Sequence, residues 1–113
     1  MQIKESSTRV AAFKLAAALE RYEMDLGELA RRRDARILRR LHEEFSELRL
    51  LGAALPKLSV AWVAVLVSRV RLLQALCGRA GPALAAIREH LAAVDSLHAR
   101  CLRNISVQDG AAA

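Results

Sequence analysis

Residues 58–78 read LSVAWVAVLVSRVRLLQALCG, and this stretch decides what kind of fold the chain can adopt. Three sides of its helical wheel are covered by apolar side chains: Trp62, Val63, Leu66, Val70, Leu72 and Leu73. A helix that is apolar nearly all round must be buried nearly all round. A small bundle does not normally enclose one helix so completely, and we therefore expect another subunit or a partner protein to cover the remaining side.

The chain before this stretch also carries apolar residues spaced by threes and fours, which is the pattern of amphipathic helices. A first helix is predicted over residues 8–24, with an N-cap among residues 6–8. A second helix is predicted from Asp25, although Gly27 would also permit one long, kinked helix. The apolar face slips across residues 31–34, and a bend or second cap at Asp34 would restore its continuity.

The chain after this stretch predicts a turn and then a last helix. Gly78, Gly81 and Pro82 form the turn, and the helix runs to about Asn104. The second helix ends near Gly52, because Pro56 follows it closely. The predicted fold is an all-α, up-down four-helix bundle over residues 1–105, with a flexible tail over residues 106–113.

Composition supports one domain with an aliphatic core. The chain has 113 residues, of which 54% are hydrophobic and only 4% aromatic. That length buries enough surface to fold without metal or disulfide support. The net charge of +6 makes an acidic partner or nucleic acid worth considering. No secretory signal is evident. The uncharged run Leu58–Ser68 is shorter than the ~20 residues that a membrane span needs. We therefore expect a cytoplasmic protein without a membrane span.

The two cysteines are predicted to be free, reduced core thiols. In an antiparallel hairpin Cys77 and Cys101 would lie about 25–35 Å apart at about 1.5 Å per residue, whereas a disulfide needs Cα atoms within about 7 Å. His98 and Cys101 are one helical turn apart, but two ligands are too few for a metal site. His90 is interpreted as a solvated or rim residue. The sequence therefore predicts no metal and no cofactor.

A basic cluster is predicted to occupy one broad face of the second helix: Arg32, Arg33, Arg36, Arg39 and Arg40. Such a stripe is able to follow phosphates, so nucleic-acid binding is one alternative. Glu43, Glu44 and Glu47 continue the helix at salt-bridging offsets, which favours a solvated face. A helix-turn-helix is excluded because Arg33 and Asp34 stand where an apolar residue and a glycine belong.

The residues Leu41-His42-Glu43-Glu44-Phe45-Ser46, followed by Gly52-Ala53, resemble part of a histidine-containing phosphotransfer domain. That family is a four-helix bundle with an exposed histidine on a central helix and a Gly-Ala pair about ten residues later. The resemblance implies His42 as the phosphorylated residue. The family's lysine and glycine, three and four residues after the histidine, are here Phe45 and Ser46. A degenerate phosphotransfer domain is therefore a second alternative, and a boundary histidine is favoured over it.

The interpretation that the sequence favours is a non-enzymatic protein-interaction module. No Ser-His-Asp elbow or glycine-rich phosphate loop is present, and no acid lies between Glu47 and Glu89. We expect a small bacterial adaptor, chaperone-like protein or regulatory subunit that forms a homodimer. The apolar helix supplies the expected interface: Trp62, Val63, Leu66, Val70 and Leu73.

Overall fold

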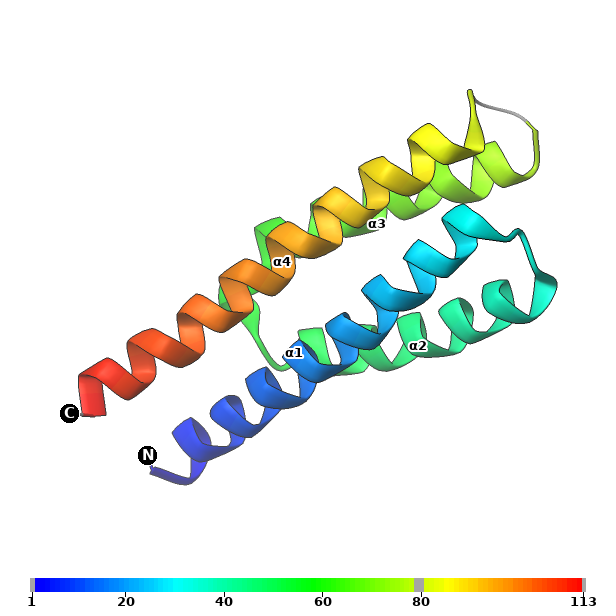
Figure 1. Ribbon diagram of the computed structural model, residues 1–113. Helices are drawn as coiled ribbons and strands as arrows, with labels where there is room; N and C mark the ends of the chain where they lie inside the picture. Colours follow the sequence, from blue (N-terminus) through cyan, green and yellow to red (C-terminus); the bar gives the residue numbers. More distant parts are fainter. Residues whose placement is uncertain (1, 79–80, 113) are drawn as a thin grey trace.

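A computed structural model describes the backbone of residues 2–78 and 81–112 and the side chains of residues 7–78 and 81–105. Its four α-helices are α1 (Gln2–Arg31), α2 (Ala35–Ala53), α3 (Ser59–Leu76) and α4 (Ala83–Ala112), with a 3-10 turn, η1 (Pro56–Leu58), before α3. The described residues contain no strand, which confirms the predicted all-α class. The molecule is elongated, measuring 49 × 23 × 19 Å (Figure 1).

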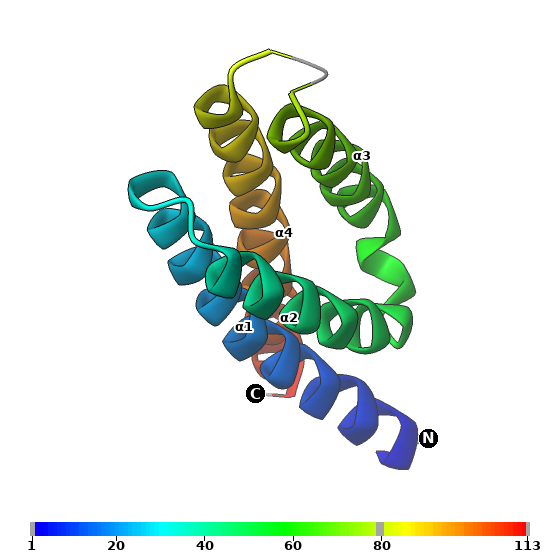
Figure 2. The ribbon, with the colours of Figure 1, turned by 90° about the vertical axis from the view of Figure 1, so that its right-hand side faces the viewer.

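The helices form two antiparallel hairpins that meet along α1 and α4. α1 packs on α2, α3 packs on α4, and the long helices α1 and α4 pack on each other (Figure 1). The α1–α2 hairpin crosses the α3–α4 hairpin at a clear angle, and α2 and α3 diverge (Figure 2). The contact between α2 and α3 is therefore made by large side chains and not by closely packed backbones.

The core is built from seams of buried residues spaced alternately by three and four, as amphipathic helices require. The seam of α1 contains Ala12, Leu15, Leu19, Tyr22, Leu26 and Leu29. The seam of α4 contains Ala83, Ile87, His90, Val94, Leu97 and Cys101. Because both seams keep one register over many turns, α1 and α4 stay in contact along most of their length.

α1 continues through Asp25 and Gly27, so the predicted start of a second helix at Asp25 is wrong. The reason is that the α1 seam passes this point without a change of phase, and packing outweighs a local capping pattern. The predicted N-cap among residues 6–8 is also wrong, because these residues lie inside α1. The chain breaks instead at residues 32–34, where the apolar face slips and Asp34 provides the expected second cap.

Asp34 is the N-cap of α2, and replacing it with alanine is expected to destabilise the fold by about 1 kcal/mol. The Asp34 Oδ1 accepts a hydrogen bond from the backbone N–H of Arg36 at 2.8 Å, which satisfies one free donor of the first helical turn. Chemical denaturation of Asp34→Ala checks this value. Arg33→Ala is the control in the same exposed connection, and an equal loss in both variants would contradict the capping role.

The predicted turn between α3 and α4 is confirmed. Gly78 and Gly81 have φ angles of 75° and 48°, a left-handed conformation that side chains disfavour. α2 ends at Ala53, close to the predicted Gly52. α4 extends to Ala112 and not to about Asn104. Flexibility of residues 106–113 stays a prediction, because their side chains and all of residue 113 lie outside the described part.

Candidate functional site

α3 buries one side and leaves a broad apolar side uncovered. Its buried residues are Val65, Ser68, Leu72 and Ala75. The uncovered side consists of six aliphatic residues with these exposed fractions: Val60 78%, Val63 56%, Leu66 36%, Val67 46%, Val70 54% and Leu73 44%. We call these six residues the outer face of α3. It includes four of the five residues predicted as an interface.

Trp62, the fifth predicted interface residue, lies at the junction of α2 and α3. Its indole stacks on the Phe45 ring with centroids 5.5 Å apart and an angle of 13° between the planes. It also covers Gly52, where an added Cβ would lie 3.8 Å from the indole. Trp62 is therefore half-buried by its own chain and borders the outer face without forming its centre.

Polar contacts fix the rotation of α3 about its own axis. Ser68 Oγ lies 2.7 Å from His90 Nδ1, and the Arg71 guanidinium pairs with Glu89 on α4. The Arg69 guanidinium lies 4.2 Å from the centre of the Phe45 ring on α2, a cation–π contact. Because α3 is apolar on several sides, hydrophobic burial does not select one rotation, whereas these three contacts do.

Ser68 and His90 belong to a buried hydrogen-bonded chain that joins α1, α3 and α4. Tyr22 Oη lies 2.7 Å from His90 Nε2, and Ser68 Oγ donates to the Val65 carbonyl at 3.0 Å. Since the Ser68 proton is used there, Ser68 accepts from His90 Nδ1–H, and Tyr22 donates to Nε2. The interpretation of His90 as a rim residue is wrong, because its ring is fully buried and these two partners satisfy both nitrogens.

This chain of hydrogen bonds holds neutral groups in place. Burial, with the positive charge of Arg69, lowers the pKa of His90 to about 4. Burial also raises the pKa of the Tyr22 hydroxyl, which keeps that donor protonated. A nucleophilic serine must donate its proton to the histidine, whereas His90 donates to Ser68. The arrangement therefore orders three helices and does not activate a nucleophile.

His42, the predicted phosphotransfer residue, is exposed on α2 beside Arg69 of α3. Arg69 Nη2 lies 3.3 Å from His42 Nδ1, and a guanidinium only donates, so Nδ1 is the acceptor. In the neutral ring the proton then sits on Nε2. Phosphoryl transfer needs a free lone pair on the attacking nitrogen, but Arg69 occupies one nitrogen and the proton occupies the other. The stacking of Trp62 on Gly52 also covers the glycine of the family's Gly-Ala pair.

The predicted basic patch is divided by the break between α1 and α2. Arg32 and Arg33 precede α2, so the expectation that all five arginines share one helical face is wrong. Arg32 pairs with Glu28 at 3.1 Å and Arg40 pairs with Asp25 at 3.0 Å. Arg36 and Arg39 are exposed on α2. Ion pairing within the chain thus reduces the positive potential of this region.

Two carboxyl groups near α1 have raised pKa values. Burial, followed by the neighbouring Asp25, raises the pKa of Glu44 to about 7. Burial also raises the pKa of Glu23, against the opposing effect of His98, whose Nδ1 lies 3.0 Å from Glu23 Oε2. Across residues 7–78 and 81–105, no three metal-binding side chains come together.

The two cysteines are both free, as predicted, but only one of them is a core thiol. The Cys101 thiol is buried and donates to the Ala12 carbonyl at 3.2 Å. Cys77 is exposed at the end of α3, so its placement in the core is wrong. The physical reason is that α3 stops at Leu76, and Cys77 leads into the glycine turn.

Comparison with known proteins gave no match. No protein-family model fits the chain, and none of the curated proteins or solved structures compared with it is significantly similar. The function is therefore argued from the surfaces of the molecule itself.

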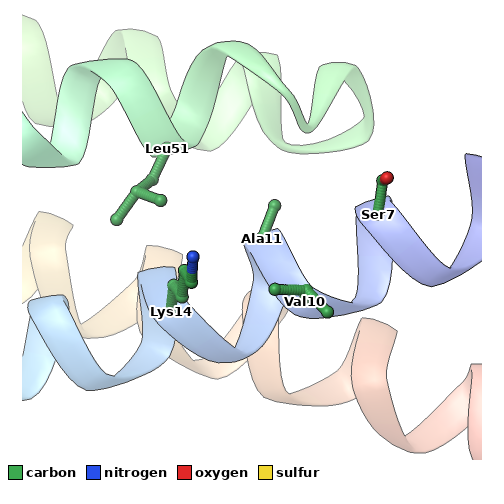
Figure 3. A pocket seen from close by; sticks show the side chains of 5 residues that line it. All are labelled: Ser7, Val10, Ala11, Lys14 and Leu51. Carbon is green, nitrogen blue, oxygen red and sulfur yellow. The ribbon is translucent and has the colours of Figure 1, made fainter.

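The grooves on the surface are shallow. One of about 310 Å³ lies between α1 and α2 and is lined by Ser7, Val10, Ala11, Lys14 and Leu51, with Ala11 pointing toward α2 (Figure 3). Another, of about 470 Å³, is lined mainly by charged residues that pair with one another, among them Glu28, Arg32 and Arg40. Neither groove contains an unpaired cluster of polar groups that points to a small ligand.

The segment Pro56–Leu76 is the one helical segment among the described residues that is long and apolar enough to cross a membrane, with a mean hydropathy of 1.5. About a third of its most apolar stretch, 33%, is buried inside the protein. This segment consists of η1 and α3. Its high hydropathy and low burial therefore have the same origin as the outer face, which is the uncovered apolar side of α3.

Proposed function

We propose that the protein is a non-enzymatic, cytoplasmic interaction module, an adaptor or regulatory subunit, that forms a homodimer through the outer face of α3. The observation that carries this proposal is the continuous row of six exposed aliphatic side chains along one helix. Arg69 and Arg71 lie on the same helix but are held at its flanks by Phe45 and Glu89. The row itself is therefore free of charge.

The size of the outer face supports association with a partner as large as a second copy. From their exposed fractions, the six side chains present on the order of 500 Å², which is in the range of functional patches on monomers. Two copies would bury about 1,000 Å², near the lower limit of a specific interface. We therefore expect a reversible dimer of moderate affinity.

Insertion of α3 into a membrane is disfavoured because the inner side of α3 packs against the rest of the protein. Removing α3 would take Ser68 from His90 and would uncover Val65 and Leu72. Arg69 and Arg71 would enter the hydrocarbon layer, at a cost of about 2.5–3.5 kcal/mol each near its centre. Surface adsorption to a bilayer remains as an outcome of the experiment below.

The two alternatives of phosphotransfer and nucleic-acid binding have less support. Arg69 occupies Nδ1 of His42, and Trp62 covers Gly52. Arg32 and Arg40 are ion-paired within the chain, which leaves Arg33, Arg36 and Arg39 as the main exposed charges of that cluster. The outer face of α3 has no such internal partners, and it is the surface that we assign to recognition.

Val63→Glu is expected to convert the dimer to a folded monomer, with at least a tenfold loss of self-affinity. Val63 is 56% exposed, so the glutamate remains solvated in the monomer, but it would be desolvated without a partner in the interface. Sedimentation measures the mass and circular dichroism the fold. Leu102→Glu is the matched control, because Leu102 on α4 is 49% exposed and lies outside the outer face.

The oligomeric state of the wild-type protein is the measurement that is able to contradict the proposal directly. A monomer at all accessible concentrations would reject the homodimer, and binding to neutral or anionic vesicles by that monomer would assign the outer face to a bilayer. A dimer that survives in Val63→Glu would show that the interface lies elsewhere, and an equal loss of dimer in Val63→Glu and Leu102→Glu would show that the loss is not specific to the outer face of α3.

A further inference from the structure

We infer that two copies of the chain pair their α3 helices antiparallel, about a twofold axis that passes between Leu66 and Val67. This inference rests on the proposed homodimer and adds its direction and register. A twofold interface uses the same patch on both copies, so each residue must face a compatible residue when the order is reversed.

The outer face of α3 meets this condition residue by residue. About the midpoint between Leu66 and Val67, Val63 of one copy lies opposite Val70 of the other, because residues seven apart share one side of a helix. The two Leu66 side chains then meet at one edge of the interface and the two Val67 side chains at the other. Each of these pairs joins two large, exposed aliphatic side chains. Neighbouring helices pack with axes about 8–10 Å apart, a separation that such side chains fill. No polar residue has to be buried at any of these levels.

Charge favours the antiparallel direction over the parallel one. α3 contains Arg69 and Arg71 and no acidic residue, and the chain has a net charge of +6. Parallel pairing would place Arg69 of one copy at the same height along the helix axis as Arg69 of the other copy, and Arg71 likewise. Antiparallel pairing displaces the two Arg69 residues by about 7 Å along the axis and the two Arg71 residues by about 13 Å, at about 1.5 Å per residue. Like charges are thereby separated without loss of the aliphatic contacts.

Disulfide trapping tests the register in the full chain. Single cysteines are introduced as Leu66→Cys, Val63→Cys and Val70→Cys in a Cys77→Ser background, because the exposed Cys77 would form its own cross-links. Under mild oxidation Leu66→Cys is expected to form covalent dimers, since the two residues flank the axis. Val63→Cys alone and Val70→Cys alone are not expected to form covalent dimers. In this register the two identical residues lie about 10 Å apart along the axis, and a disulfide needs Cα atoms within about 7 Å.

Mixing the variants gives the complementary result. An equimolar mixture of Val63→Cys and Val70→Cys is expected to yield a mixed covalent dimer. Efficient self-cross-linking of Val63→Cys and Val70→Cys, each alone, would show parallel pairing and overturn this inference while leaving the homodimer intact. A non-covalent dimer in which none of the variants cross-links would place the interface on another face and overturn both proposals, as would a monomeric wild-type protein.

Discussion

His90→Ala is expected to lower the free energy of unfolding by about 3–5 kcal/mol, a large part of the stability of a small domain. The substitution leaves a cavity in the core where α1, α3 and α4 meet. It also leaves the Tyr22 hydroxyl without its acceptor, at a cost of about 1–3 kcal/mol for a buried polar group. Urea denaturation followed by circular dichroism measures the loss.

His42→Ala is the matched control for this prediction, because His42 is an exposed histidine on the neighbouring helix α2. Its effect is expected to stay within about 0.5 kcal/mol. Tyr22→Phe removes one hydroxyl without a large cavity and is expected to cost about 1–3 kcal/mol. Losses below about 1 kcal/mol in both His90→Ala and Tyr22→Phe would show that the buried hydrogen-bonded chain contributes little.

Acidification from pH 6.5 to about pH 4 is expected to remove about 3 kcal/mol of the stability that neutral His90 provides. Its pKa is lowered to about 4 in the folded protein, from an ordinary value of 6.5, by burial and by Arg69. Between these two pH values the unfolded chain binds a proton that the folded protein does not bind. Stability from this residue is therefore complete above pH 6.5 and is lost as the pH falls.

Glu44 changes the stability with pH in the opposite direction, so its effect must be distinguished from that of His90. Its pKa of about 7 lies above the ordinary 4.5, so the folded protein binds its proton more tightly, and its contribution is lost as the pH rises toward 7. The difference in unfolding free energy between the wild type and His90→Leu cancels the Glu44 effect. This difference is expected to shrink by about 3 kcal/mol between pH 7 and pH 4. A constant difference would contradict the assignment.

Hydrophobic periodicity was sufficient to predict an all-helical chain and the excess of apolar surface on α3, but it did not predict where α1 begins and ends. The exposure of Val60 and Val63 confirms that this helix has more apolar perimeter than the rest of the chain buries. The direction of burial was not predictable from the same signal, because a helix that is apolar on most sides has no preferred inner face. The side chains that decide it, Ser68 and Arg71, find their partners on another helix.

His90 shows a signal that was present in the sequence but was outweighed by residue type. Position 90 falls three after Ile87 and four before Val94, so the alternation of fours and threes places it in the buried seam of α4. The apolar Leu91 next to it fits the same spacing from Ile87 and Val94, yet Leu91 is only half-buried. Burial of a histidine needs partners for both nitrogens. Those partners, Tyr22 and Ser68, are far away in the chain and are identified only when the helices are placed together.

In α3, the residues that hold the helix in place are different from the residues that form its exposed apolar surface. Ser68, Arg69 and Arg71 hold the helix in position from its inner side and flanks. The six outward aliphatic residues are between 36% and 78% exposed, so conservative changes there cost the isolated subunit less stability than changes in its core. Drift among Val, Leu, Ile and Met at these outward positions would therefore leave folding intact while it changes which surfaces fit, so the specificity of the protein is able to evolve almost independently of its stability.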